Sequence, residues 1–121
     1  MNLPVDRSRR PERRSVQAGT APIAELEIPA DSQREREFEI SCAMTVRANA
    51  GAETPAHELR VYADGELQWS RRIPTQHPAP FDGLEMRFRR RVAVGRALRL
   101  QAHADCTEGR RLSLLIEADE A

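Results

Sequence analysis

The sequence predicts an all-β protein, a two-layer antiparallel β-sandwich of about seven short strands that follows a disordered basic tail. Its 121 residues, 40% of them hydrophobic, are enough for one small domain. Apolar residues alternate with polar ones from residue 24 onward, which is the period of a strand. No stretch of comparable length has the apolar spacing of a helix, and five prolines interrupt any longer one: Pro29, Pro55, Pro74, Pro78 and Pro80.

The tail is defined by its charge and by its lack of apolar residues. Residues 1–22 contain five arginines and two acids, so they carry 5 − 2 = +3, and the rest of the chain carries 14 − 17 = −3. So few large hydrophobes cannot bury enough surface to offset the entropy of ordering. We therefore expect residues 1–22 to be disordered and residues 23–121 to form the sandwich.

The strands follow in order from the apolar positions of each alternating segment. The longest is residues 36–48, in which Phe38, Ile40 and Cys42 begin the inward face. The remaining inward positions of this and the other predicted strands are Leu26/Ile28, Met44/Val46/Ala48, Leu59/Val61, Leu67/Trp69, Leu84/Met86/Phe88/Val92/Val94, Leu98/Leu100/Ala102/Ala104 and Leu112/Leu114/Ile116.

A hairpin is predicted at Ala63-Asp64-Gly65, and loop length decides which residues face each other across it. A two-residue Asp-Gly loop would divide the apolar residues between the two faces. A three-residue loop, with Gly65 left-handed in a bulge, places Val61 beside Leu67 and Leu59 beside Trp69. Burial favours the second register.

These features resemble an immunoglobulin-like domain of the bacterial, fibronectin-type kind, over about residues 24–118. The resemblance is carried by the Val61–Leu67 hairpin, the segment from Val94 to Asp105, and Gly109 with the last strand. It implies that residues 36–48 are strand B and that the strand around residues 84–92 is strand E, its neighbour. Cys42 and Cys106 would then lie on strands B and F of opposite sheets.

Two states of these cysteines stay open. A disulfide between Cys42 and Cys106 would stabilise the fold by about 4 kcal/mol through loop entropy. The favoured interpretation is two free thiols that act as small hydrophobes. Without a visible export signal we expect a cytoplasmic protein, unless the chain is a piece of a longer precursor.

The sequence offers no signature of an enzyme, a metal site or a cofactor. It lacks the Gly-x-Ser-x-Gly, phosphate-loop and His-Glu-x-x-His patterns. His103 and Asp105 share an outward face, while His57 and His77 fall in loops, so we interpret the histidines as solvated surface groups. A non-catalytic protein without metal or cofactor is expected.

Arginines supply the candidate binding residues. Arg87, Arg89 and Arg91, reinforced by Arg90, form an outward row that could contact anions. If strands B and E are neighbours, Glu37 and Glu39 lie opposite these arginines, and a charge ladder is the favoured interpretation. The tail offers four more candidates that nothing nearby neutralises: Arg9, Arg10, Arg13 and Arg14.

Three functions follow from these features. The first is a non-catalytic module for binding another protein or for self-association, through an edge strand or end loops. The second is anion or nucleic-acid binding through the tail and the arginine row. The third is binding of a small ligand or carbohydrate, which needs an exposed Trp69 near Tyr62 or Arg71. No apolar run is long enough for a membrane span.

Overall fold

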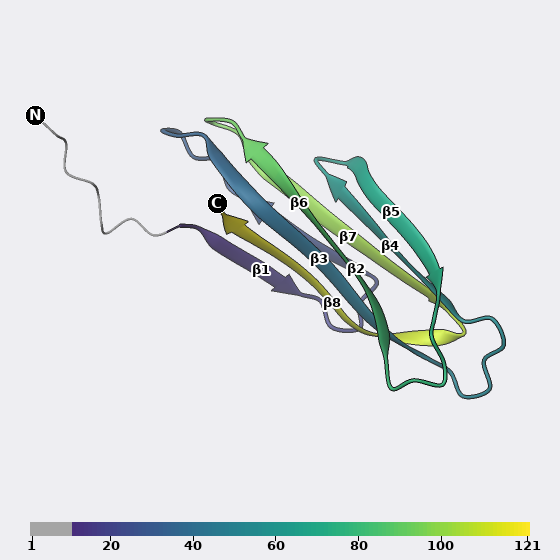
Figure 1. The fold of residues 1–121 in the computed structure, drawn as a ribbon. Helices are drawn as coiled ribbons and strands as arrows, with labels where there is room; N and C mark the ends of the chain where they lie inside the picture. Colours follow the sequence, from purple (N-terminus) through teal and green to yellow (C-terminus); the bar gives the residue numbers. More distant parts are fainter. Residues whose placement is uncertain (1–10) are drawn as a thin grey trace, which may run out of the picture.

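The computed structural model describes residues 11–121 and confirms the all-β class with two antiparallel sheets (Figure 1). Eight strands and no helix are present in this range. Their bounds are β1 (Arg13–Gln17), β2 (Ile23–Ile28), β3 (Arg36–Ala48), β4 (Ala56–Ala63), β5 (Glu66–Pro74), β6 (Asp82–Val92), β7 (Leu98–Thr107) and β8 (Gly109–Glu120). One sheet has the order β1-β8-β3-β6, and the other has the order β2-β7-β4-β5.

The pairing of the strands identifies the topology. The first strand pairs with the last, β2 with β7, β3 with β6 and β4 with β5, all antiparallel. This is the pattern of one long hairpin. Further pairing of β8 with β3 and of β7 with β4 rolls that hairpin into two stacked sheets. Eight strands connected in this way form a jelly roll.

The strand order differs from the immunoglobulin-like arrangement to which the sequence pattern pointed. That arrangement puts strand A, which precedes strand B in the chain, beside it. Here β3 lies between β6 and the last strand, β8. The predicted pairing of residues 36–48 with the strand around residues 84–92 is confirmed, with Glu37 opposite Arg91 and Glu39 opposite Arg89.

The strand beyond the seven predicted ones is β1, and it lies where the sequence predicted disorder. Arg13–Gln17 forms β1 and pairs with β8, so the prediction is wrong for this segment. Apolar alternation gave no signal, because Val16 is the only large apolar residue in the strand. Backbone pairing with β8 holds β1, together with Val16, which is partly buried against the core. Residues 1–10 of the predicted tail lie outside the described residues.

The hairpin between β4 and β5 has the two-residue loop and not the favoured three-residue one, so the predicted pairs Val61–Leu67 and Leu59–Trp69 are wrong. Ala63 pairs with Glu66, so the loop has two residues, and both Asp64 and Gly65 have positive φ, at 49° and 81°. Two positive φ values define a type I′ turn, whose twist suits a hairpin. The pairing then shifts by one residue, so that Val61 lies opposite Trp69 and Leu67 lies opposite Tyr62.

The core is aliphatic and lies between the sheets, as the alternation predicts. Its fully buried members include Phe38, Ile40, Leu59, Leu100 and Leu114. Two predicted inward residues are exposed. The two-residue turn pairs Leu67 with Tyr62 of the outer face, leaving Leu67 54% exposed, and Val94 lies beyond the end of β6 at 50% exposure.

The long loop between β5 and β6 is attached to the core by a histidine that the sequence placed in a solvated loop. His57 lies in β4 and is fully buried. Its Nε2–H donates to the carbonyl oxygen of Gly83 at 3.1 Å, and its Nδ1 accepts from the Thr75 hydroxyl at 2.7 Å. Buried polar groups require such partners, so His57 fixes both ends of this loop.

Candidate functional site

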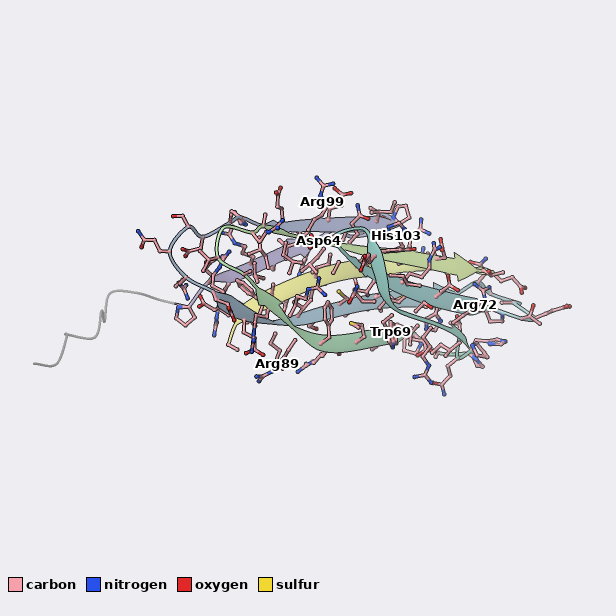
Figure 2. The ribbon with its side chains drawn as sticks, turned by 90° about the horizontal axis from the view of Figure 1, so that it is seen from above. Asp64, Trp69, Arg72, Arg89, Arg99 and His103 are labelled. Carbon is pink, nitrogen blue, oxygen red and sulfur yellow. The ribbon has the colours of Figure 1, made fainter. Side chains whose placement is uncertain are left out.

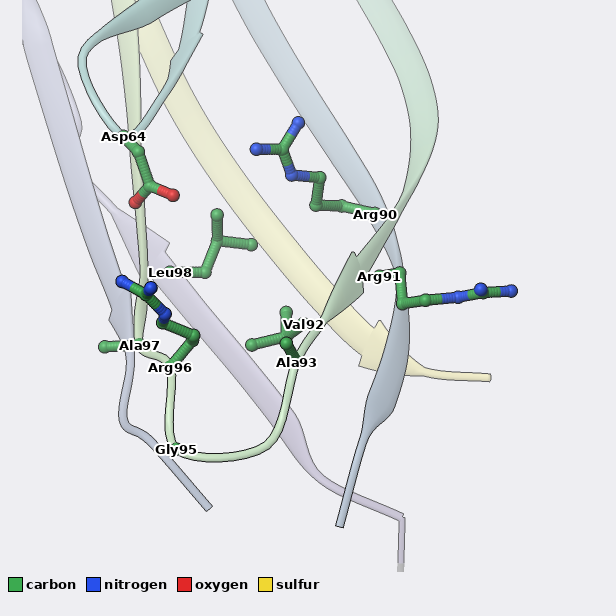
Figure 3. Close-up of a pocket in the computed structure, with 9 residues that line it drawn as sticks. All are labelled: Asp64, Arg90, Arg91, Val92, Ala93, Gly95, Arg96, Ala97 and Leu98. Carbon is green, nitrogen blue, oxygen red and sulfur yellow. The ribbon is translucent and has the colours of Figure 1, made fainter. Parts of the chain in front are cut away.

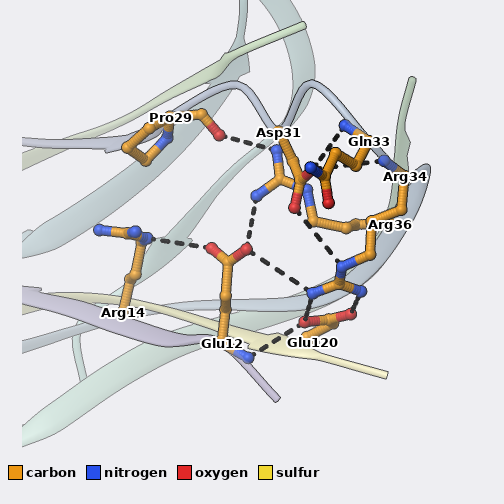
Figure 4. Close-up of polar contacts among 8 residues, drawn as sticks. All are labelled: Glu12, Arg14, Pro29, Asp31, Gln33, Arg34, Arg36 and Glu120. Atoms are coloured by element: carbon orange, nitrogen blue, oxygen red, sulfur yellow. Dashed lines mark hydrogen bonds and ion pairs between the residues drawn. The ribbon is translucent and has the colours of Figure 1, made fainter. Parts of the chain in front are cut away.

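One side of the sandwich, where β1 and β2 are the edge strands, is closed by an ionic network (Figure 4). Arg36, only 3% exposed, donates to Glu12 and to the carbonyl oxygen of Pro29, both at 2.7 Å. Arg34 binds both carboxylate oxygens of Glu120. The backbone N–H of Glu12 also donates to Glu120 at 3.1 Å.

These contacts shift the pKa of one carboxyl group. Hydrogen bonds from Arg34 lower the pKa of Glu120 to about 2, and the backbone N–H of Glu12 acts in the same direction. The carboxylate is therefore ionised at neutral pH and joins the β2–β3 connection to the end of β8. Because these charges are paired with one another, the network joins segments that are far apart in the chain.

The opposite side, where β5 and β6 are the edge strands, is open. The inward residues of β6, namely Leu84, Met86 and Phe88, pack against the core but are only partly buried. Trp69 of β5 is also only partly buried, whereas on the opposite side the inward residues of β2 are all buried and only Val16 of β1 is partly buried. This side therefore presents a partly uncovered apolar strip between two strand edges, which we call the open side.

The predicted arginine row lies along the open side on the outer face of β6. The side chains of Arg87, Arg89 and Arg91 are more than half exposed. Each has a carboxylate partner: Arg87 with Glu85 at 3.0 Å, Arg89 with Glu37 at 4.0 Å, and Arg91 with Glu35 at 3.0 Å. Figure 2 shows Arg89 extending from the molecule on the same side as Trp69.

The tail arginines divide between described and undescribed residues. Arg13 lies 3.9 Å from Asp119, and Arg14 lies 3.4 Å from Glu12, both on or beside β1. Arg9 and Arg10 lie outside the described residues. The structure thus places Arg13 and Arg87–Arg91 at opposite edges of one sheet, with the acids of β8 and β3 between them.

A cleft opens at one end of the open side, between the turn at Asp64 and the β6–β7 loop (Figure 3). Its volume is about 660 Å³, with Val92 and Leu98 among its lining residues. Arg90 and Arg96 point into it, whereas Arg91 points away. Asp64 is fixed there, because it accepts the backbone N–H of Arg99 at 3.0 Å.

Sequence reasoning missed most of this cleft. Arg90 was counted with the outward row, yet it lies opposite Phe38 on the inward face. Its position in the series 84, 86, 88, 90, 92 was the available signal. Nothing in the sequence joins Asp64 to Arg96, because the fold alone brings their two turns together.

The described residues give no support for chemistry at a thiol or metal centre. Cys42 and Cys106 are free thiols, and burial raises the pKa of the Cys42 thiol to about 12. Residues 11–121 contain no group of three or more histidine, cysteine or acidic side chains that could hold a metal. Nor does any helix able to span a membrane occur within that range.

Comparisons with known proteins concern the fold. No family model matches the sequence, and neither does any curated protein. The chain is similar to part of dimeric latent PorU from Porphyromonas gingivalis, with 14% identity and a TM-score of 0.50 over 91% of this chain and 13% of that chain.

Two viral structures give lower scores. The Gt strain structure of infectious bursal disease virus has 9% identity and a TM-score of 0.41, over 99% of this chain and 38% of that chain. The VP2 subviral particle of the same virus has 11% identity and a TM-score of 0.41, over 95% and 34%. The chain therefore spans well under two thirds of each of these neighbours.

Proposed function

We propose that this chain is a non-catalytic jelly-roll module that binds another protein through its open side. The observation that carries the proposal is the half-exposed apolar strip of β6 and β5, next to two strand edges. Apolar surface of this kind gains free energy when a partner covers it, and an edge strand offers unpaired backbone groups for hydrogen bonding. The immunoglobulin-like relationship forms no part of the proposal, because the strand order differs.

The proposal is tested by comparing one apolar-to-acid change on each side of the sandwich. Met86→Asp places a charge in the apolar strip, and Ile23→Asp makes the matched change at exposed Ile23 on β2. We expect the purified wild-type chain and the Ile23 variant to retain the same partner in affinity capture, and the Met86 variant to lose it.

Circular dichroism and urea unfolding would establish that both variants are folded. Sedimentation of the purified chain would show whether the retained partner is a second copy. Equal retention by both variants, or no partner for the wild-type chain, would contradict the proposal.

Anion binding is a second candidate function, located at the cleft and not at the predicted arginine row. Arg90 and Arg96 both point into the cleft, where a small ligand would lie between two turns, whereas the arginines of the outer row lie along an exposed strand edge. Guanidinium groups bind phosphate and carboxylate through paired hydrogen bonds. A ligand with one such group and an apolar part would suit the cleft.

The anion candidate is tested by titrating inorganic phosphate and following backbone amide shifts by NMR. Shifts should be localised to residues 90–98 and disappear in Arg90→Ser/Arg96→Ser. The control Arg71→Ser changes an exposed arginine outside the cleft and should leave them intact. Shifts spread over all exposed arginines would show general charge screening and refute a site.

Carbohydrate binding has less support from the geometry. It requires an exposed aromatic face, whereas Trp69 packs partly against the core. Tyr62 lies on the outer face, where its ring contacts His103 with centroids 4.8 Å apart and planes tilted by 51°. These two aromatic residues therefore do not share one face.

A further inference from the structure

We propose that the partner of the open side is an extended segment in which acidic residues alternate with apolar ones, and that it pairs with β6 as an added strand. This inference rests on the proposed function and specifies the partner's chemistry. A strand paired with β6 would place alternate side chains on the outer and inner faces of the sheet. The outer face of β6 carries arginines and the inner face is apolar, so the two faces require different side chains from that partner.

On the outer face, the partner would meet a row of positive charge. Arg87, Arg89 and Arg91 point to this face from the free edge. On the paired side of β6, the positions opposite Arg89 and Arg91 are occupied by Glu39 and Glu37 of β3. An added strand with acidic residues opposite Arg89 and Arg91 would place carboxylates beside these arginines on the free edge of β6 as well.

Charge from β3 does not prevent this pairing. An added strand lies about 5 Å from β6 and about 10 Å from β3. Because the Debye length is about 8 Å at physiological ionic strength, the arginines dominate over the more distant acids. Each guanidinium has five N–H donors, so Arg89 can bind a second carboxylate while keeping Glu37.

The inner face of β6 requires apolar partners. Met86 lies opposite Cys42, and Phe88 lies opposite Ile40, so both extend the core of β3 outward. Both are half-exposed because no strand follows β6 in its sheet. Valine or isoleucine at alternate partner positions would cover Met86, Phe88 and the nearby Trp69.

The arginines also disfavour one specific occupant, the β6 strand of a second copy paired about Arg89. Antiparallel pairing about Arg89 would put Arg87 opposite Arg91 and Arg89 opposite its own copy. Like charges directly opposite each other destabilise a strand pair. The row therefore favours an acidic partner over self-pairing of this edge.

The test uses a blocked peptide of about seven residues that alternates glutamate with valine, a length typical of a strand. Trp69 is the only tryptophan, and it lies on the open side, so its emission reports binding directly. We expect a saturable blue shift with the glutamate peptide that weakens as salt is added. A peptide alternating lysine with valine should give no shift.

Matched charge reversals locate the interaction. Arg89→Glu should lower the affinity for the glutamate peptide about tenfold or more, because attraction is replaced by repulsion. Arg47→Glu makes the same net change at an exposed arginine beyond the end of the β3–β6 pairing and should leave affinity unchanged. Equal weakening by both variants would overturn the inference, because it would indicate a general charge effect.

A last comparison separates failure of this inference from failure of the proposed function. If the glutamate peptide does not bind, while Met86→Asp still removes a captured protein, the open side binds a partner of other chemistry and only the inference fails. If Arg87→Ser/Arg89→Ser/Arg91→Ser then dimerises, the arginines serve to prevent edge pairing. If neither the peptide nor a captured protein depends on the open side, both proposals fail.

Discussion

The two long sides of the sandwich differ in how their edge strands are covered. On the β1/β2 side, the inward residues of β2 are buried and the network of Glu12, Arg34, Arg36 and Glu120 covers the end. On the β5/β6 side, the apolar inward residues are only partly buried, and Arg87, Arg89 and Arg91 point outward along the edge. The closed side uses its charges within the molecule, and the open side presents them to solvent.

This difference explains why charge alone does not identify a site. Arginines at both sides have carboxylate partners, but Arg34 and Arg36 of the closed side are more deeply buried than the outer-row arginines of the open side. Buried charges must be satisfied internally, because leaving one unpaired costs several kcal/mol. Exposed pairs contribute little and can exchange partners. Binding is therefore expected where weak pairs lie beside uncovered apolar surface.

The largest expected effect is a difference in the free energy of unfolding between two isoleucine-to-alanine variants, one on each side. Ile28→Ala, at a fully buried position of β2, should lower the free energy of unfolding by about 2–5 kcal/mol, because it leaves a cavity. Ile73→Ala, at a half-buried position of β5, should lower it by about 1 kcal/mol. Urea unfolding with unchanged m-values measures both, and equal losses would remove the distinction between the sides.

A smaller effect is expected from Glu120→Gln in the closed side. At neutral pH, loss of the charged partner of Arg34 should lower the free energy of unfolding by about 1–3 kcal/mol. The folded pKa of about 2 lies below the ordinary 4.5, so this stabilisation is complete above about pH 4.5. It declines as the pH falls toward 2, where wild type and variant should converge.

The control for this prediction is Glu66→Gln, at an exposed position beside the open side. Its stability should follow that of the wild type at every pH. A difference between wild type and Glu120→Gln that stayed constant down to pH 2 would mean that ionisation of Glu120 is not the cause.

The smallest effect is expected from Leu67→Ser in the bulged hairpin. Leu67 faces outward, so the change should alter the free energy of unfolding by no more than about 0.5 kcal/mol. In the register that burial alone favoured, Leu67 would lie inside beside Val61 and the loss would be several-fold larger. Chemical denaturation therefore decides between the two hairpins, and a loss above about 2 kcal/mol would reject the two-residue loop.

Sequence reasoning recovered the features that depend on local alternation. Phe38, Ile40 and Leu114 are buried as their period of two predicts, and β3 pairs with β6 so that Glu39 lies opposite Arg89. The predictions were wrong where the alternation was weak, as in β1, and where a turn set a different register, as in the hairpin between β4 and β5. β1 has too few apolar residues to be recognised, and the Asp-Gly turn forms a two-residue loop, after which a bulge in β5 brings Trp69 opposite Val61.

The alternation of side chains by itself determined the class of the protein, because a period of two admits strands and leaves no room for helices. Tertiary structure alone decided that β8 inserts between β1 and β3, that Glu12 contacts Arg36, and that Asp64 and Arg96 line the same cleft. Such contacts join residues far apart in the chain. Their energies depend on the path of the rolled hairpin, and no local spacing encodes that path.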